Sequence, residues 1–163
     1  MRNLLILPLL ILLAACQTVT KPTGFSSQQV AALQQEGFKP VGETWELGIE
    51  DRVLFEVDKS DLQSDRAAII EKLARNLLGI GIGGSLVEGH TDATGSSDYN
   101  RSLSLRRAET VKAAMIAAGM AEPAVRVVGL GETDPVDTND TPEGRQQNRR
   151  VVVIVAPPDI VRR

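Results

Sequence analysis

The sequence predicts an α/β fold, a two-layer sandwich in which helices cover one face of a mixed sheet. Two observations predict it. Short apolar runs, of which Arg150–Val155 is the most β-branched, alternate with longer segments that carry apolar residues at helical spacing. Aromatic residues make up only 3% of the chain, so the core must consist of aliphatic side chains. The expected element order is β-α-β-α-β-β, and the chain contains no internal repeat.

The first half of this order lies between residues 53 and 88. We expect a strand at residues 53–57, followed by a helix that Ser64 or Asp65 caps. The apolar positions of this helix recur every three or four residues: Ala67, Ile70, Leu73, Ala74 and Leu77. A glycine-rich run at residues 79–84 ends the helix and leads into a strand at residues 85–88.

The second half begins with a longer helix, which Ser96 or Ser97 caps and Gly119 ends. Its predicted core stripe consists of Tyr99, Leu103, Val111, Met115 and Ala118. A strand at residues 125–128, a long polar loop at residues 129–147 and the strand Arg150–Val155 complete the order. The β-branched composition of this last strand predicts a central place in the sheet.

The N-terminus has the pattern of an export signal. Arg2 precedes an apolar run that is too short to cross a bilayer, which takes about 20 residues. Leu13-Ala14-Ala15-Cys16 resembles a bacterial lipobox, which implies cleavage before Cys16 and acylation of that residue. Gln17 stands where an inner-membrane retention aspartate would stand, so we expect a lipid anchor in the outer membrane that faces the periplasm.

The chain therefore divides into four predicted segments. These are a signal peptide (1–15), a lipidated cysteine with tether, short helix and connector (16–46), a folded domain (47–157) and a tail (158–163). The net charge of −3 offers no strong basic patch, which argues against nucleic acid as a partner. Cys16 is the only cysteine, so no intrachain disulfide and no thiolate metal cluster can form.

One acid and one arginine define a candidate binding pocket. Asp92 follows a predicted strand on a glycine-flanked turn, and ligands of α/β sheets bind at such carboxyl ends. Arg107 lies four residues after Leu103, beside the buried stripe of the next helix, and its side chain leans back toward that turn. Arg106 is turned by about 100° and is expected to be solvated. Asn100 is expected to orient the backbone of the turn.

These residues belong to a longer pattern. Gly89-His90-Thr91-Asp92, Gly95, Asn100, Leu103-Ser104 and Arg107-Ala108 resemble the signature of the OmpA-like peptidoglycan-binding domain. A second block, Gly129-x-Gly131-Glu132 through Asn148-Arg149-Arg150, resembles the end of that domain. The resemblance covers roughly residues 47–155 and implies the βαβαββ form of the predicted sandwich.

The resemblance implies noncovalent binding of the peptide stem of peptidoglycan. Asp92 would take the ammonium and Arg107 the carboxylate of meso-diaminopimelate, with Thr91, Asn100 and Leu103 in support. The remaining motif residues have structural roles: Gly89, His90, Gly95, Asn148 and Arg149. We expect Asn148, Arg149 and Arg150 to fix the long loop or to pair with carboxylates such as Glu132. No cofactor or metal is implied.

Two other classes of function stay open. An enzyme could use Glu88, His90 and Asp92 as a metal or acid–base site, but one histidine and one lipidated cysteine are too few for a zinc site, so we predict no catalysis. A cell-wall hydrolase is the remaining enzymatic alternative. A Tol–Pal-like lipoprotein would instead dock a periplasmic protein, with residues 25–46 as its contact surface.

Overall fold

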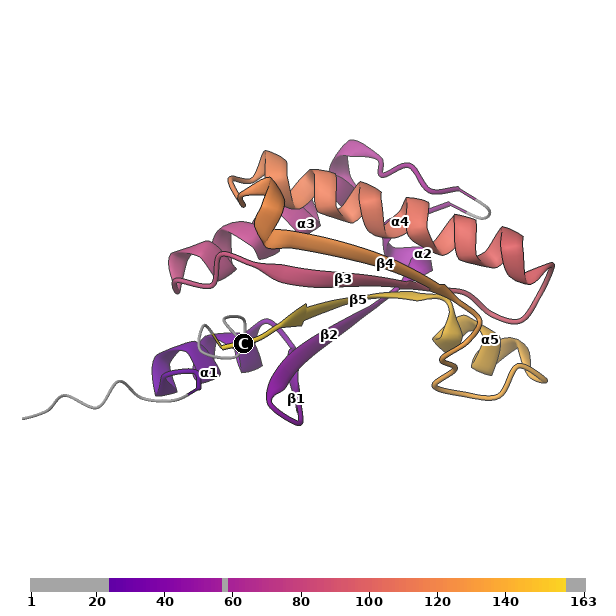
Figure 1. The fold of residues 1–163 in the computed structure, drawn as a ribbon, viewed down its shortest axis with the longest axis horizontal. Coiled ribbons are helices and arrows are strands. Elements are labelled where there is room, and N and C mark those ends of the chain that lie inside the picture. Colours follow the sequence, from indigo (N-terminus) through magenta and orange to yellow (C-terminus); the bar gives the residue numbers. More distant parts are fainter. Residues whose placement is uncertain (1–23, 57–58, 158–163) are drawn as a thin grey trace, which may run out of the picture.

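The structure, a computed structural model, describes residues 24–56 and 59–157 (Figure 1). The predicted signal peptide, Cys16, the first part of the tether, Val57 and the tail lie outside the described residues. None of the helices described is long and apolar enough to cross a membrane.

The strands form one mixed sheet in the order β1-β2-β5-β3-β4. Their bounds are Lys39–Val41 for β1, Thr44–Glu50 for β2, Ser85–His90 for β3, Val125–Gly131 for β4 and Arg150–Val155 for β5. Only β3 and β4 run parallel, and the other neighbours are antiparallel. The predicted central place of β5 is therefore confirmed.

Two long helices cover one face of this sheet, α3 (Ser64–Gly79) and α4 (Ser97–Ala117) (Figure 1). Ser96 caps α4 as predicted, because its hydroxyl accepts from the Tyr99 amide. The shorter helical elements are α1 (Ser27–Gln35), α2 (Asp51–Leu54), the 3-10 turn η1 (Glu122–Ala124) and α5 (Pro142–Asn148). The predicted fold, a mixed sheet with helices on one face, is confirmed.

The aliphatic core lies between the sheet and these two helices. Alternate strand residues Val87, Val151 and Val153 point into it and are fully buried. Ile70 of α3 and Val111 of α4 meet them from the helical layer. The stripe predicted for α4 begins later than expected, since the side chain of Tyr99 is 47% exposed.

The first predicted strand is wrong. Residues 51–54 form α2, and the sheet instead begins upstream with β1 and β2, in residues that we expected to be mostly connector. A short apolar run fits a strand and a buried helical turn equally well, so the spacing of its apolar residues could not distinguish the two. The burial shows the difference: Val53 is 43% exposed, whereas Leu54 and Phe55 are both buried.

The polar segment 129–147, which we expected to be a loop, is partly regular, since its first residues belong to β4. Its last part is the helix α5, in which Thr141 caps the first turn by accepting from the Gly144 amide at 3.1 Å. Pro142 occupies the first helical position, where the missing amide proton costs nothing. The segment thereby presents Arg149 directly after a helix and before β5.

Candidate functional site

The described residues enclose a cavity of about 560 Å³ where β3 ends. Its walls come from α2, from the loop between β3 and α4, from the first half of α4 and from α5. All five residues predicted to contact a ligand line it: Thr91, Asp92, Asn100, Leu103 and Arg107. Residues distant in the sequence, among them Asp51, Gln146 and Arg149, complete the wall.

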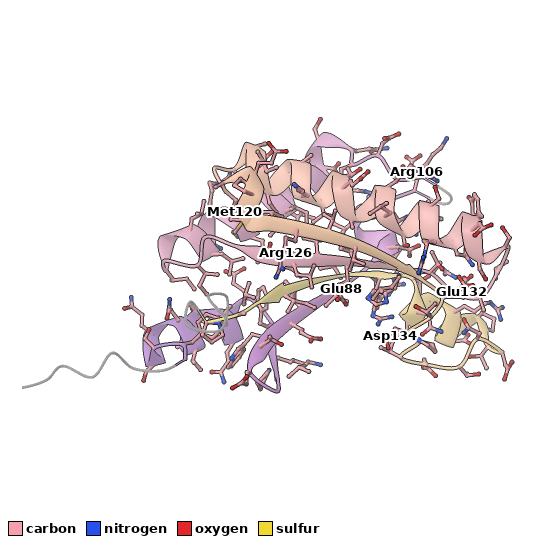
Figure 2. The ribbon with its side chains drawn as sticks, viewed as in Figure 1. Glu88, Arg106, Met120, Arg126, Glu132 and Asp134 are labelled. Carbon is pink, nitrogen blue, oxygen red and sulfur yellow. The ribbon has the colours of Figure 1, made fainter. Side chains whose placement is uncertain are left out.

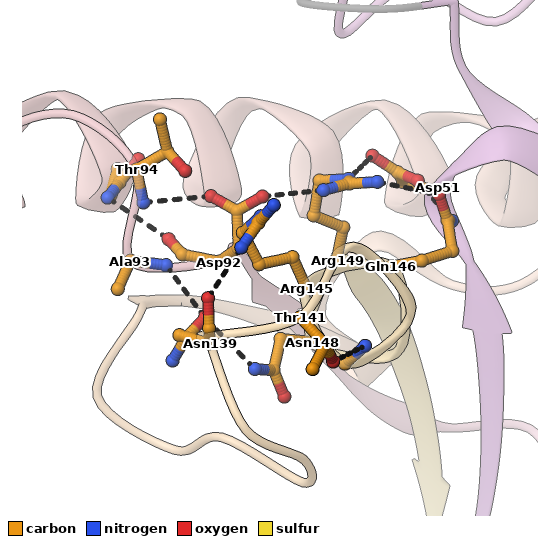
Figure 3. Close-up of polar contacts among 12 residues, drawn as sticks. Asp51, Asp92, Ala93, Thr94, Asn139, Thr141, Arg145, Gln146, Asn148 and Arg149 are labelled. Carbon is orange, nitrogen blue, oxygen red and sulfur yellow. Dashed lines mark hydrogen bonds and ion pairs between the residues drawn. The ribbon is translucent and has the colours of Figure 1, made fainter.

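Asp92 is held in the loop by a network of short contacts (Figure 3). Its Oδ1 accepts from the Thr94 amide at 2.9 Å, and its Oδ2 accepts from Nη1 of Arg149 at 2.6 Å. Asn100 donates to the backbone oxygen of Asp92 at 3.3 Å, so it orients this loop. Burial raises the pKa of the Asp92 carboxyl, but the hydrogen bonds from Arg149 and Thr94 outweigh burial and leave it below its usual value.

Arg107 is buried, with 3% of its surface exposed. Its Nη1 lies 3.3 Å from Oδ2 of Asp51, and its Nε donates to the backbone oxygen of Lys59 at 3.0 Å. The guanidinium carbon lies 5.1 Å from the centre of the Phe55 ring, a cation–π distance. These contacts fix the orientation of the guanidinium group at the wall of the cavity. Arg106, by contrast, is exposed as predicted.

Asp51 and Arg149 connect the two predicted ligand contacts. Oδ2 of Asp51 lies 3.4 Å from Nε of Arg149, in addition to its contact with Arg107. Gln146 braces the pair: it donates to Oδ1 of Asp51 at 3.1 Å and accepts from Nη2 of Arg149 at 2.6 Å. Figure 3 shows Arg149 between Asp92 and Asp51. With the contact between Arg107 and Asp51, charges of alternating sign run from Arg107 through Asp51 and Arg149 to Asp92.

Asn148 fixes the segment before α5, as predicted. Its side-chain oxygen accepts from the amides of Val136 and Asp137, and its nitrogen donates to the backbone oxygen of Asp137. The same nitrogen donates to Asn139, whose Oδ1 also accepts from the Ala93 amide next to Asp92. This segment and the Asp92 loop are thus held together.

Arg149 and Arg150 pair with carboxylates, as predicted, but these carboxylates are not the Glu132 that we named as an example. Arg149 pairs with Asp92 and Asp51, whereas Arg150 lies 3.3 Å from Oδ2 of Asp134. Glu132 instead accepts from the Ser97 hydroxyl. The sequence could not identify these partners, because Asp51, Asp92 and Asp134 are distant in the chain from the arginines that they contact.

His90 is 1% exposed, and its Nε2 lies 3.5 Å from Oε2 of Glu88. Burial, with help from Arg150, lowers the pKa of its imidazole to about 4, so the ring is neutral at pH 7. Glu88 and Asp134 lie on the side of the sheet away from α4 (Figure 2). Within residues 24–56 and 59–157, no group of three His, Cys, Asp or Glu side chains could hold a metal ion.

Comparison with known proteins shows the family to which the chain is similar. The model of the OmpA family matches residues 54–149. Outer-membrane lipoprotein YfiB of Pseudomonas aeruginosa is 45% identical over 143 residues, which cover 88% of this chain and 85% of the relative. Putative lipoprotein YfiB of Escherichia coli K12 is 35% identical over 150 residues, which cover 91% of this chain and 92% of the relative.

Solved structures agree with this fold. The cell wall anchor of the T6SS from Pseudomonas aeruginosa superposes with a TM-score of 0.68 at 25% identity, over 80% of this chain and 95% of that one. The peptidoglycan-associated lipoprotein from Burkholderia pseudomallei gives a TM-score of 0.57 at 28% identity, over 66% of this chain and 88% of that one. The family match begins at Leu54, so Asp51 lies ahead of it.

Proposed function

Because the chain is an outer-membrane lipoprotein that belongs to the OmpA family, we propose that it tethers the outer membrane to the cell wall by binding the diaminopimelate of peptidoglycan stem peptides. The predicted family and localisation are thereby confirmed, and the chain is not an enzyme, since its family is one of binding domains. The anchor would be the acylated Cys16 that remains when residues 1–15 are removed.

One observation carries the proposal: Asp92 and Arg107 line the same cavity. A free end of diaminopimelate carries an ammonium and a carboxylate on one carbon atom. The ammonium would bind the Asp92 carboxylate, and the carboxylate would bind the guanidinium of Arg107, which Phe55 and Asp51 hold in place. Arginine suits this role because its planar fork matches a carboxylate.

A single site of this kind gives modest affinity. Each charge-assisted hydrogen bond contributes about 1.5–3 kcal/mol net. The wall offers many identical stems, and a lipid anchor would confine the domain beside them. The resulting effective concentration makes the attachment durable without a tight individual site.

Co-sedimentation with purified sacculi tests this proposal. The chain from Gln17 to Arg163, made without the lipid, is expected to pellet with sacculi, and free meso-diaminopimelate is expected to release it. Asp92→Ala and Arg107→Ala should each abolish pelleting, whereas Arg106→Ala, next to Arg107 but exposed, should not. Circular dichroism would verify that each variant is folded. Unchanged pelleting of both folded pocket variants would refute the proposal.

A further inference from the structure

We infer that the Asp51–Arg149 pair sets the charge balance of the cavity and makes it select ligands that carry an ammonium and a carboxylate together. This inference rests on the proposed binding of diaminopimelate and names the residues that decide its selectivity. Asp51 and Arg149 are positioning residues here, since they act through Arg107 and Asp92.

The order of the four charges supports this role. Successive contacts measure 3.3 Å from Arg107 to Asp51, 3.4 Å from Asp51 to Arg149 and 2.6 Å from Arg149 to Asp92. Two cations and two anions alternate, so their charges cancel. The two ends of this series, Arg107 and Asp92, are the residues that we assign to the ligand. The inner pair therefore couples the two ligand contacts, because each of its members lies beside the opposite charge of one of them.

A zwitterion would place its ammonium beside Asp92 and its carboxylate beside Arg107. Each charge of the ligand would then meet an opposite charge of the series. A ligand with carboxylates alone would leave an anion facing Asp51 and Asp92. A ligand with amines alone would leave a cation facing Arg107 and Arg149. Because the four side chains are buried or half-buried, such repulsion is screened less than it is at an open surface.

The other charged side chains that line the cavity have partners outside its wall. Arg52 lies 2.6 Å from Glu50, and Glu56 accepts from the side chain of Gln63. Arg145 donates to the backbone oxygens of Asn139 and Asp140, at 2.8 and 3.1 Å. Glu50 neutralises Arg52, and Glu56 and Arg145 carry opposite charges, so removing one charge of the series shifts the balance of the described lining by one unit.

Gln146 supplies a matched control. It hydrogen-bonds both Asp51 and Arg149 but carries no charge. Gln146→Ala removes the brace and leaves the charge balance intact. This variant separates two effects. Loss of the hydrogen bonds that position Asp51 and Arg149 should weaken the binding of all ligands in proportion, whereas a change in charge should alter the ranking of their affinities.

The test uses the full-length protein, purified from membranes in detergent and bound to sacculi, with three soluble competitors. These are meso-diaminopimelate, pimelate, which has the same carbon chain with carboxylates and no amines, and 1,5-diaminopentane, which has the amines and no carboxylates. Each competitor is titrated to the concentration that releases half of the protein. The wild type should prefer diaminopimelate over either of the others by about tenfold or more.

The two charge variants should change this ranking in opposite directions. Asp51→Asn leaves a net positive cavity, so pimelate should gain about tenfold relative to diaminopimelate. Arg149→Gln leaves a net negative cavity, so 1,5-diaminopentane should gain by a similar factor. Arg149→Lys keeps the charge and should keep the wild-type ranking, as should Gln146→Ala. If one charge variant does not fold, the other decides alone.

Two failures can be told apart. Release of the wild type by diaminopimelate, with the same ranking in Asp51→Asn and Arg149→Gln as in the wild type, would overturn this inference and leave the proposed function standing. A shift in ranking for Gln146→Ala equal to that of a charge variant would also overturn it. A wild-type protein that binds sacculi and resists diaminopimelate would overturn the proposed function and this inference together.

Discussion

Gly89 lies where β3 passes directly under α4, and a hydrogen atom there replaces a side chain. A Cβ built on this residue would overlap the backbone oxygen of Ser104. Gly129 of β4 meets the same helix, since its Cβ would lie 2.7 Å from the backbone oxygen of Arg101. Both contacts are with backbone, which cannot rotate away. Gly89 of the Gly-His-Thr-Asp motif thus allows α4, the helix that carries Arg107, to pack closely against β3.

We predict that Gly89→Ala lowers the free energy of unfolding by about 3 kcal/mol, because α4 must move away from β3. Urea denaturation would measure the loss. Gly48→Ala is the matched control: this glycine also lies in a strand, and its Cβ would meet nothing within 4 Å. Equal stability of the two variants would contradict this reading of the motif.

His90 should make stability depend on pH. Its folded-state pKa of about 4 is below the ordinary value of 6.5, so between these values the unfolded chain takes up a proton that the folded chain does not. The free energy of unfolding should therefore fall as the pH falls through this window, by up to about 3 kcal/mol. The raised pKa of Glu88, due to burial and to Glu46 and Asp134, acts in the opposite sense.

His90→Gln isolates the contribution of the imidazole. The variant should lose less stability than the wild type between pH 6.5 and pH 4, as measured by urea denaturation at a series of pH values. Parallel curves for the two proteins would show that His90 does not titrate in this window.

At the residue scale, the sequence predicts the cavity only in part. The positions of Asp92 and Arg107 can be predicted from local rules, because Asp92 follows a strand and Arg107 lies at helical spacing from the buried Leu103. Asp51 carries no local signal, since its partners Arg107 and Arg149 are distant in the chain and it lies ahead of the family match. Arg149 belongs to the recognised motif, but its partner depends on where α5 packs.

At the scale of elements, the segment ahead of the family match contributes to the core. Leu33 of α1 and Phe38, which precedes β1, are buried with the residues of α3 and the sheet. β1 carried no strand pattern, because its three residues are all exposed and include Pro40. An edge strand tolerates both features. Alternation of apolar residues is therefore a poor guide to a short edge strand.

We predict that Leu33→Ala lowers the free energy of unfolding by about 2–5 kcal/mol, since it leaves a cavity in a fully buried position. Gln34→Ala, on the exposed side of the same helix, should change stability by less than about 0.5 kcal/mol. Urea denaturation of both variants compares them. A loss as small for Leu33→Ala as for Gln34→Ala would mean that α1 only lies on the domain.

The helix α5 could have been predicted. Thr141-Pro142 is a typical start of a helix, with a capping hydroxyl followed by proline. The polar composition of the surrounding segment concealed it, because α5 buries little: only Gly144 and Asn148 are buried. The long helices α3 and α4, by contrast, have apolar stripes, and both lie where predicted. The predicted cap of α3 is wrong, since Gln63 and not Ser64 or Asp65 is its N-cap, without a side-chain hydrogen bond.

At the scale of the whole molecule, the two ends of the sheet have different roles. α1 lies at one end and α5 at the other (Figure 1). Residues of α5 line the cavity, which therefore lies at the end away from α1. The chain thus enters the domain on the side opposite its proposed ligand site. This arrangement suits a protein that holds a membrane at one end and the wall at the other, and it follows from the fold, not from any single motif.

The most direct test of the central claim is a titration of the ¹⁵N-labelled protein with meso-diaminopimelate, followed by NMR. We predict saturable shifts in the amides of Thr94 and Gly95 and in the side-chain Nε–H of Arg107 and Arg149, with the amide of Val41 on β1 unchanged. Asp92→Ala should remove these shifts. Saturable shifts confined to other parts of the sheet, or none at concentrations that release the protein from sacculi, would contradict the central claim.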